Sequence, residues 1–152
     1  RAAFPPSAIV EACGSYRRGA ADCGDVDVLV STPGEAENLC AVAVERLAAD
    51  GFLTATLQLT RDSTVEGSQW MGGCRLASLG RPELTEYTRH RRLDIKVYPT
   101  RSRSFALLYF GSGQAFNRAV RLWATRRGYS LSDRGIRKCT RGKNDRGEQV
   151  VL

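Results

Sequence analysis

The sequence predicts an α/β (α+β) fold: a mixed β-sheet flanked by helices, followed by a small C-terminal lobe of helices and a hairpin. Two observations support this prediction. Up to about residue 99, the chain has several segments in which apolar and polar side chains alternate, and one segment with helical spacing. After residue 99, helical spacing dominates. A chain of 152 residues has room for one domain and a small lobe. We therefore expect a sheet domain over residues 1–99 and a lobe over residues 100–152.

The first two predicted strands lead to a possible anion site and an acidic pair. Residues 8–13 form a short strand that stops at Gly14-Ser15, which can begin a tight turn and offer backbone N–H groups to an anion. Residues 25–30 form the next strand, in which valines alternate with a leucine and two aspartates. Because alternate side chains of a strand share a face, Asp25 and Asp27 lie on the same side.

A helix and three further strands complete the predicted sheet domain. Thr32 as N-cap, Pro33 at the first helical position and Glu35 three residues after the cap form a capping box. Apolar residues then keep helical spacing until Gly51, which ends the helix. Alternation predicts strands, separated by polar connections, over residues 53–60, 70–76 and 91–99.

The C-terminal lobe is predicted to be helical before it reaches a hairpin region. Helical spacing begins at Phe105, is interrupted at residues 111–113 and resumes until Gly128. Residues 128–136 and 139–152 are typical of a small hairpin region. We expect the second helix to turn its apolar residues toward the core: Phe116, Ala119, Val120 and Trp123.

The charge of the chain is divided unevenly between its halves. Residues 1–80 carry 6 Lys/Arg against 10 Asp/Glu, whereas residues 81–152 carry 17 against 6. Twenty of the 23 basic residues are arginine, whose planar guanidinium matches pairs of phosphate oxygens. The basic half therefore favours a polyanionic partner such as nucleic acid, although a solvated basic surface would give the same composition.

Cysteine and hydropathy patterns exclude several classes of protein. The five cysteines form no CxxC pair and His90 is the single histidine, which argues against a zinc site and a Cys–His catalytic pair. We expect buried, reduced thiols in a cytosolic or nuclear protein. The longest apolar run, residues 105–110, is too short to span a bilayer, so we expect no membrane partner.

A third carboxylate suggests a reaction at phosphate. The strand over residues 91–99 places Asp94 on its polar face next to Arg92. Nucleotidyl transfer requires charge neutralisation on the phosphate and a deprotonated hydroxyl, and two Mg²⁺ ions about 3.5–4 Å apart, held by carboxylates, supply both. Asp25, Asp27 and Asp94 meet this requirement. An Asp-X-Asp strand by itself more often marks an exposed polar face.

The wider pattern is more specific than the acidic pair. Gly14-Ser15, nine intervening residues, an Asp-Val-Asp strand and a later apolar-Asp-apolar strand resemble the nucleotidyltransferase superfamily. The segments GSYRRG, CGDVDVLV, GGCRL, RRLDIKV, LLYF and FNRAVR are similar, in order and spacing, to those of family X DNA polymerases. This resemblance covers residues 13–133. It implies a nucleotidyltransferase-fold catalytic palm over residues 1–99 and a truncated, nucleotide-selecting C-terminal lobe, or thumb, over residues 100–152.

The resemblance also implies roles for individual residues. The catalytic acids that bind two Mg²⁺ ions, or Mn²⁺ in their place, would be Asp25, Asp27 and Asp94. Nucleotide-binding residues would be Gly14, Ser15, Arg18 and Gly24 at the triphosphate, Tyr109 and Phe110 at the sugar, and Asn117 at the base. DNA would be contacted by Arg92 at the primer end and Arg121 at the template. Asp133 falls where the family has a glutamate that partners the closing helix.

Each of these roles has a structural alternative. Ser15 could cap a helix, and Arg18 could be a solvated arginine. Arg92 is also a plausible internal ion-pair partner of Asp94 when no metal is bound. Tyr109 and Phe110 lie in an apolar helical run and could be plain core.

Two departures from the family pattern affect the expected function. Family members usually have Tyr-Phe-Thr-Gly-Ser at the hinge, whereas this chain has Tyr109-Phe110-Gly111-Ser112-Gly113, which moves the glycine. The chain also begins at Arg1 rather than Met and ends in an apolar run, so we interpret it as a piece of a longer protein. The family's helix-hairpin-helix and lyase segments would lie outside it.

The resulting expectation is a monomeric, nuclear, template-dependent DNA polymerase that uses dNTPs to fill short gaps in base excision repair or end joining. A template-independent terminal transferase is an alternative, disfavoured because those relatives usually have Gly-Trp where Tyr109 and Phe110 stand; extension without a template would reveal it. A non-catalytic DNA-bridging module would show no Mg²⁺-dependent dNTP binding. An RNA-directed nucleotidyltransferase would prefer ATP to dATP.

Overall fold

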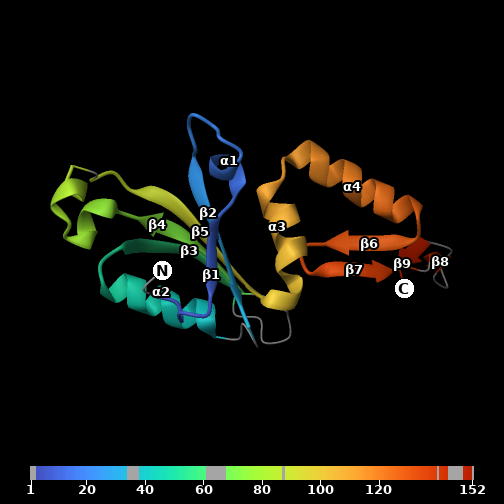
Figure 1. Cartoon of the computed structure of the whole chain (residues 1–152), viewed down its shortest axis with the longest axis horizontal. Coiled ribbons are helices and arrows are strands. Elements are labelled where there is room, and N and C mark those ends of the chain that lie inside the picture. The colour runs from blue at the N-terminus through green and yellow to red at the C-terminus, as the bar shows by residue number, and fades with distance from the viewer. Residues whose placement is uncertain are drawn as a thin grey trace.

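The computed structural model describes residues 3–33, 38–60, 68–86, 88–139, 141–143 and 149–151. Its main sheet has five strands in the order β1-β2-β5-β4-β3 (Figure 1). Strands β2 and β5 are parallel, and the other neighbouring pairs are antiparallel. The predicted mixed sheet is therefore confirmed. Its strands are β1 (Ile9–Ala12), β2 (Asp25–Thr32), β3 (Leu53–Thr60), β4 (Ser68–Cys74) and β5 (Arg91–Pro99).

Helices cover the two faces of this sheet, and alternate residues of its central strands pack against them. The face that carries Val30 and Ile95 packs against helix α2 (Leu39–Ala49). On the opposite face, Leu29 and Tyr98 pack against helix α3 (Arg103–Gly111). Alternate residues of β2 and β5 thus enter two separate cores, and α2 and α3 lie on different sides of the sheet (Figure 1). By alternation, the acidic face of β2 is the one that meets α3.

The start of α2 differs from the predicted capping box. Thr32 is the last residue of β2, where it pairs with Pro99, because extension of the parallel β2–β5 ladder holds it in the sheet. The described helix begins at Leu39, with Asn38 as N-cap. Glu35 lies outside the described residues. The end of α2 is as predicted, since Gly51 has a left-handed φ of 73°.

Between β3 and β5, the structure also differs from the prediction in one respect. The predicted strand over residues 70–76 is shifted, because β4 ends at Cys74 and Leu76 belongs to the 3₁₀ turn η1 (Leu76–Leu79). A second turn, η2 (Pro82–Leu84), follows before β5. Residues 61–67 lie outside the described residues.

The C-terminal lobe consists of helices and a hairpin, as predicted. The short turn η3 (Thr100–Ser102) leads into α3, and helix α4 (Gln114–Arg126) follows. Strands β6 (Tyr129–Ser132) and β7 (Gly135–Lys138) form the hairpin, and β8 (Arg141–Lys143) pairs with β9 (Gln149–Val151). In the described residues, no helix is both long and apolar enough to cross a membrane.

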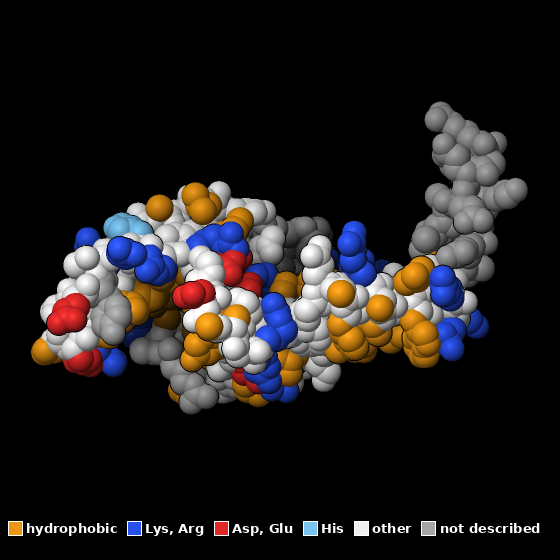
Figure 2. Space-filling view, turned by 90° about the horizontal axis from the view of Figure 1, so that it is seen from above, with side chains coloured by type: hydrophobic (Ala, Val, Ile, Leu, Met, Phe, Trp, Pro, Cys, Tyr) orange, Lys and Arg blue, Asp and Glu red, His pale blue; other side chains and the backbone are white. Residues whose placement is uncertain are grey.

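The predicted inner face of α4 is wrong for Phe116, Ala119 and Trp123, whereas Val120 is partly buried on the side that meets β6. Phe116 is 52% exposed and Trp123 is 56% exposed, so Trp123 is not core. Helix α4 contacts β6 through another side, on which Ala124 is buried and Asn117 is half-buried. Hydrophobic side chains consequently lie on the surface of this lobe (Figure 2).

The cysteines are free thiols, and three of them are buried as expected. Burial raises the pKa of Cys13 and Cys74, and it raises the pKa of Cys40 to about 11. Cys23 and Cys139 are only partly buried, which corrects the expectation of five buried thiols.

Candidate active site

The parallel pairing of β2 and β5 brings the acidic residues together. In this register Asp27 lies opposite Asp94, and Asp25 lies opposite Arg92. Opposite residues of neighbouring strands share a face, so the three carboxylates project from the same side of the sheet. They lie at the start of both strands, beyond the part of this face that α3 covers.

Two cationic side chains on β5 form ion pairs with the three carboxylates. Arg92 forms ion pairs with Asp25 and, through Nε at 3.3 Å from Oδ1, with Asp94. The Lys96 ammonium donates to Asp27 Oδ1 at 2.7 Å and lies 3.7 Å from Asp94 Oδ2. Each cation is therefore shared by two carboxylates, and acidic and basic side chains adjoin on the surface (Figure 2).

This arrangement bears on whether the carboxylates fit Mg²⁺. Carboxylate oxygens are the hard ligands that Mg²⁺ prefers, and Asp27 and Asp94 already share one cation. The buried Oδ1 atom of Asp94 accepts no hydrogen bond from the described residues. With Arg92 and Lys96 in place, however, no group of three metal-binding side chains is gathered among the described residues. The donor set fits Mg²⁺, and metal binding would require these two cations to move.

The Gly14-Ser15 turn lies directly against the acidic pair. Gly14 begins the short helix α1 (Gly14–Arg17), and the preceding Cys13 N–H donates to the Asp27 carbonyl at 2.8 Å. Gly14 has a φ of 61°, and a Cβ atom there would lie 2.2 Å from Asp27 Oδ2. Only glycine allows this turn to approach the carboxylate so closely.

A cleft of about 630 Å³ opens between this turn, the acidic pair and the C-terminal lobe. Its volume is within the range of small-molecule sites. Most of the predicted site residues line it: Gly14, Ser15, Arg18, Asp25, Asp27, Tyr109, Phe110, Asn117 and Arg121. The cleft therefore combines carboxylates at one wall with arginines and aromatic rings at the other.

Three predicted residues do not line the cleft. Arg92 is joined to the cleft through its ion pair with Asp25, and Asp94 through the two cations, Arg92 and Lys96, that it shares with the acidic pair. Gly24 precedes Asp25 in the chain. Conversely, the cleft is also lined by residues to which the sequence assigned no role in nucleotide binding: Ser112, Gln114 and Arg118. Helical spacing from Asn117 and Arg121 could have indicated Gln114 and Arg118, since positions three and four apart share a helix face.

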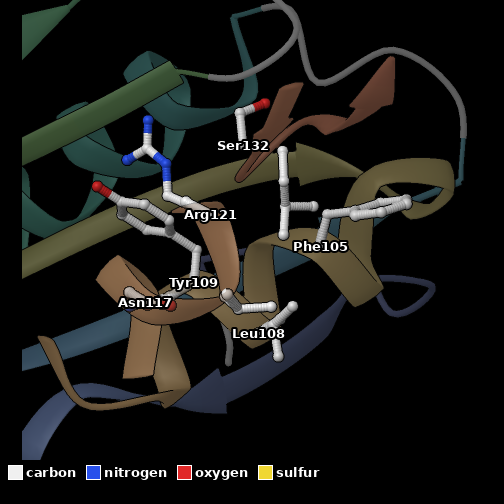
Figure 3. Close-up of a pocket in the computed structure, with 8 residues that line it drawn as sticks. Phe105, Leu108, Tyr109, Asn117, Arg121 and Ser132 are labelled. Atoms are coloured by element: carbon white, nitrogen blue, oxygen red, sulfur yellow. The ribbon is translucent and has the colours of Figure 1, made fainter. Parts of the chain in front are cut away.

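The wall formed by α3 and α4 is held together by contacts among the predicted nucleotide-binding and DNA-binding residues. The rings of Tyr109 and Phe110 meet edge to face, with centroids 5.0 Å apart. Asn117 Nδ2 donates to the Tyr109 carbonyl at 2.6 Å, and the Arg121 guanidinium lies 5.8 Å from the Tyr109 ring (Figure 3). The Lys96 ammonium lies 4.7 Å from the Phe110 ring, which connects this wall to the acidic centre.

A further hydrogen bond joins the acidic face of β5 to the hairpin. The Tyr98 hydroxyl donates to Asp133 at the β6–β7 turn. Burial raises the pKa of Tyr98, and the adjacent Asp133 carboxylate raises it further, so the hydroxyl remains a donor. Sequence alternation places Tyr98 on the face of Asp94, but it gives no sign of this partner.

Comparison with known proteins agrees with this geometry. Residues 1–100 match a family model for the DNA polymerase beta palm, and residues 106–151 match one for the DNA polymerase beta thumb. The chain belongs to the family X DNA polymerases. The resemblance to this family that the motifs indicated is therefore confirmed, together with the mixed α/β palm fold.

Individual members of family X show the same similarity. DNA polymerase lambda of Rattus norvegicus is 38% identical over 136 residues, which cover 88% of this chain and 22% of that protein. DNA polymerase lambda of Arabidopsis thaliana is 36% identical over 130 residues, 81% of this chain and 23% of that protein. The chain thus spans less than a quarter of the length of these curated relatives.

Proposed function

We propose that this chain is the palm, residues 1–99, and part of the nucleotide-selecting thumb, residues 100–152, of a template-dependent DNA polymerase. The enzyme adds deoxynucleotides to a primer 3′ end and releases pyrophosphate. The observation that carries the proposal is the parallel register that sets Asp27 opposite Asp94, beside a cleft lined by Ser15 and Arg18. Membership of family X supports the reaction class.

In the proposed reaction, different residues of the cleft contact different parts of the nucleotide. Ser15 and Arg18 bind the triphosphate, and Gly14 lets the phosphates approach the acidic pair because it carries no side chain. Tyr109 and Phe110 form the wall against which the sugar packs. Asn117 and Arg121 line the same cleft and contact the base pair in the proposed reaction.

Asp25, Asp27 and Asp94 would hold Mg²⁺, which when bound supplies neutralisation of the phosphate charge and a more acidic primer hydroxyl. Until then Arg92 and Lys96 form ion pairs with these carboxylates. Arg92 is exposed enough to turn from Asp25 toward a primer phosphate, which would give it its proposed DNA contact.

The biological setting follows from the same proposal. A DNA polymerase of this family acting on gapped or primer-template DNA would work in the nucleus, as a monomer, in short-gap repair such as base excision repair or end joining. The basic C-terminal half supports binding to the DNA backbone.

Primer extension on one-nucleotide gapped DNA, with the full-length protein that contains this chain, tests the function. Asp25→Ala is expected to slow extension about 10³-fold, the equivalent of several kcal/mol of transition-state stabilisation. Asp50→Ala, at the exposed C-cap of α2, is the matched control and should be unaffected. A normal rate for Asp25→Ala would contradict the proposal, and equal extension without template would indicate terminal transfer instead.

A further inference from the structure

The last turn of α3 ends in carbonyl groups that need partners from elsewhere. The final four carbonyls of any helix lack an intrahelical donor, and they carry the negative end of the helix dipole. Here the Ser112 N–H donates to the Leu108 carbonyl at 3.3 Å, and Asn117 Nδ2 donates to the Tyr109 carbonyl at 2.6 Å. The carbonyls of Gly111, the last residue of α3, and of Ser112 begin the link to α4.

Arg18 supplies the donor for these two carbonyls from a distant part of the chain. Its Nη1 atom lies 3.5 Å from the Gly111 oxygen and 3.3 Å from the Ser112 oxygen, and donates to both. Arg18 follows α1 and lines the cleft together with Ser15 and the acidic pair. One guanidinium therefore touches the α3–α4 link and the site proposed for the triphosphate.

The guanidinium has a second edge that can take a ligand. Within the described part of the chain, Nε and Nη2 of Arg18 have no hydrogen-bond partner. A guanidinium offers five N–H groups in a planar fork, and two parallel N–H groups match two phosphate oxygens. Arg18 can thus bind a phosphate through one edge while Nη1 remains on the link carbonyls.

We propose that Arg18 is a positioning residue that couples a bound polyphosphate to the order of the α3–α4 link, residues 111–113. This inference rests on the proposed function, because it takes the cleft as a triphosphate site. A phosphate held by Arg18 fixes the guanidinium, and the fixed guanidinium holds the end of α3. Tyr109 and Asn117 flank this link, so the phosphate end of a nucleotide orders the residues proposed to face its sugar and base.

The neighbouring arginine provides a matched control. Arg17 also lies at the link, since a Cβ on Gly111 would lie 3.6 Å from Arg17 Cδ. Its guanidinium nevertheless faces the other way: Nη1 donates to the Ala12 carbonyl at 3.3 Å and lies 3.7 Å from Glu11. Arg17→Lys and Arg18→Lys both keep the positive charge. Only Arg18→Lys removes a guanidinium that contacts both the α3–α4 link and the cleft.

Hydrogen exchange of the full chain, with and without inorganic tripolyphosphate in EDTA, tests the coupling. We expect tripolyphosphate to slow amide exchange at residues 111–116 about fivefold or more in the wild type and in Arg17→Lys, and less than twofold in Arg18→Lys. A lysine ammonium can still bind the anion, so calorimetry should show binding to all three proteins, several-fold weaker for Arg18→Lys.

The outcomes separate this inference from the proposed function. Tripolyphosphate that binds the wild type without slowing exchange at the link, or that slows it equally in Arg18→Lys, overturns the coupling and leaves the triphosphate site standing. Faster exchange would mean that phosphate pulls Arg18 from the carbonyls, which also overturns it. Absence of binding to the wild type would overturn both. If Arg18→Lys fails to fold, the wild-type response alone decides.

Discussion

Lys96 occupies the position between Asp27 and Asp94 that a metal ion would need. Its ammonium is mostly buried and is shared by the two carboxylates, while the Phe110 ring offers it a second contact. Mg²⁺ would therefore have to displace a charge that is already well paired. The affinity of this centre for Mg²⁺ would therefore depend on the strength of the Lys96 contacts that the metal replaces.

Lys96→Met removes this competition and keeps the length of the side chain. We expect Mg²⁺ to bind about tenfold more tightly, a difference of about 1.4 kcal/mol, while the metal-free protein loses stability because three carboxylates then face one another with Arg92 as their remaining partner on β5. Mg²⁺ titration followed by thermal unfolding measures both effects. Lys138→Met, on the exposed hairpin, is the control. Unchanged Mg²⁺ affinity would show that Lys96 does not compete.

Gly14 offers a test of the close approach between the turn and Asp27. Gly14→Ala should cost more stability than Gly19→Ala, although both positions have a left-handed φ, of 61° and 75°. The added Cβ would meet Asp27 Oδ2 at position 14 and nothing within 4 Å at position 19. We expect about 1 kcal/mol at Gly19 from backbone strain alone, and a further 1–3 kcal/mol or so at Gly14 from overpacking. Urea unfolding of the two variants compares them, and equal losses would contradict the steric account.

The sequence predicted which acids form the centre, but it did not predict that Lys96 pairs with them. Two-residue alternation placed Asp25, Asp27 and Asp94 on polar faces, and the motif spacing suggested that two strands bring them together. Alternation also places Lys96 two residues from Asp94, but it cannot indicate that this lysine turns toward Asp27 on a neighbouring strand. That choice depends on the parallel register, which is set by contacts between distant segments.

At the scale of the elements, the buried side chain of Tyr98 joins β5 to the hairpin. Tyr98 packs beneath α3 and donates its hydroxyl to Asp133 at the β6–β7 turn. Because burial and Asp133 raise the tyrosine pKa, the folded state favours the protonated hydroxyl. The stability from this bond is therefore fully present below the usual tyrosine pKa of about 10, and is lost only as the pH rises through the higher pKa of the folded state.

Tyr98→Phe keeps the ring and removes the donor. We expect the free energy of unfolding to fall by about 1–2 kcal/mol, and by the same amount at pH 7 and pH 9, because the hydroxyl stays protonated over that interval. Chemical denaturation at the two pH values measures the difference. Tyr129→Phe, at a partly exposed ring of β6, should change little. A loss confined to pH 7 would argue against a protonated donor.

Some elements were predicted from local pattern and others were decided by their neighbours. Strands β3 and β5 and the end of α2 follow their alternation and their terminal glycine closely. Thr32 has the sequence context of an N-cap, yet pairing with Pro99 keeps it in β2. The apolar stripe of α4 is real, but helical spacing cannot say which side of a helix its neighbours cover, and Trp123 lies outside.

At the scale of the whole molecule, the separation of charge predicts how DNA binding responds to salt. The half of the chain over residues 81–152 has 17 basic residues against 6 acidic ones, and helix α4 carries arginines but no acidic residue. A surface of this kind binds DNA mainly by releasing counterions from phosphates.

Raising the salt concentration from 50 to 200 mM should weaken binding to gapped DNA about 10²-fold or more. Arg118→Gln, in the wall of the cleft, should lower the slope of log K against log salt by about one. Arg46→Gln, on the exposed side of α2, should leave the slope unchanged. Fluorescence anisotropy with a labelled gapped duplex measures each slope, and an equal effect of the two variants would remove the case for a DNA surface at the cleft.

The parallel pairing of β2 with β5 also fixes when the acidic centre can come into existence. Parallel neighbours cannot be joined by a tight turn, so α2, β3 and β4 are made before β5 returns beside β2. During synthesis, Asp25 and Asp27 therefore leave the ribosome long before Asp94 and the two cations that neutralise them. Until β5 emerges, the nascent chain carries an uncompensated acidic pair, and the strand that supplies the third acid also supplies its counter-ions.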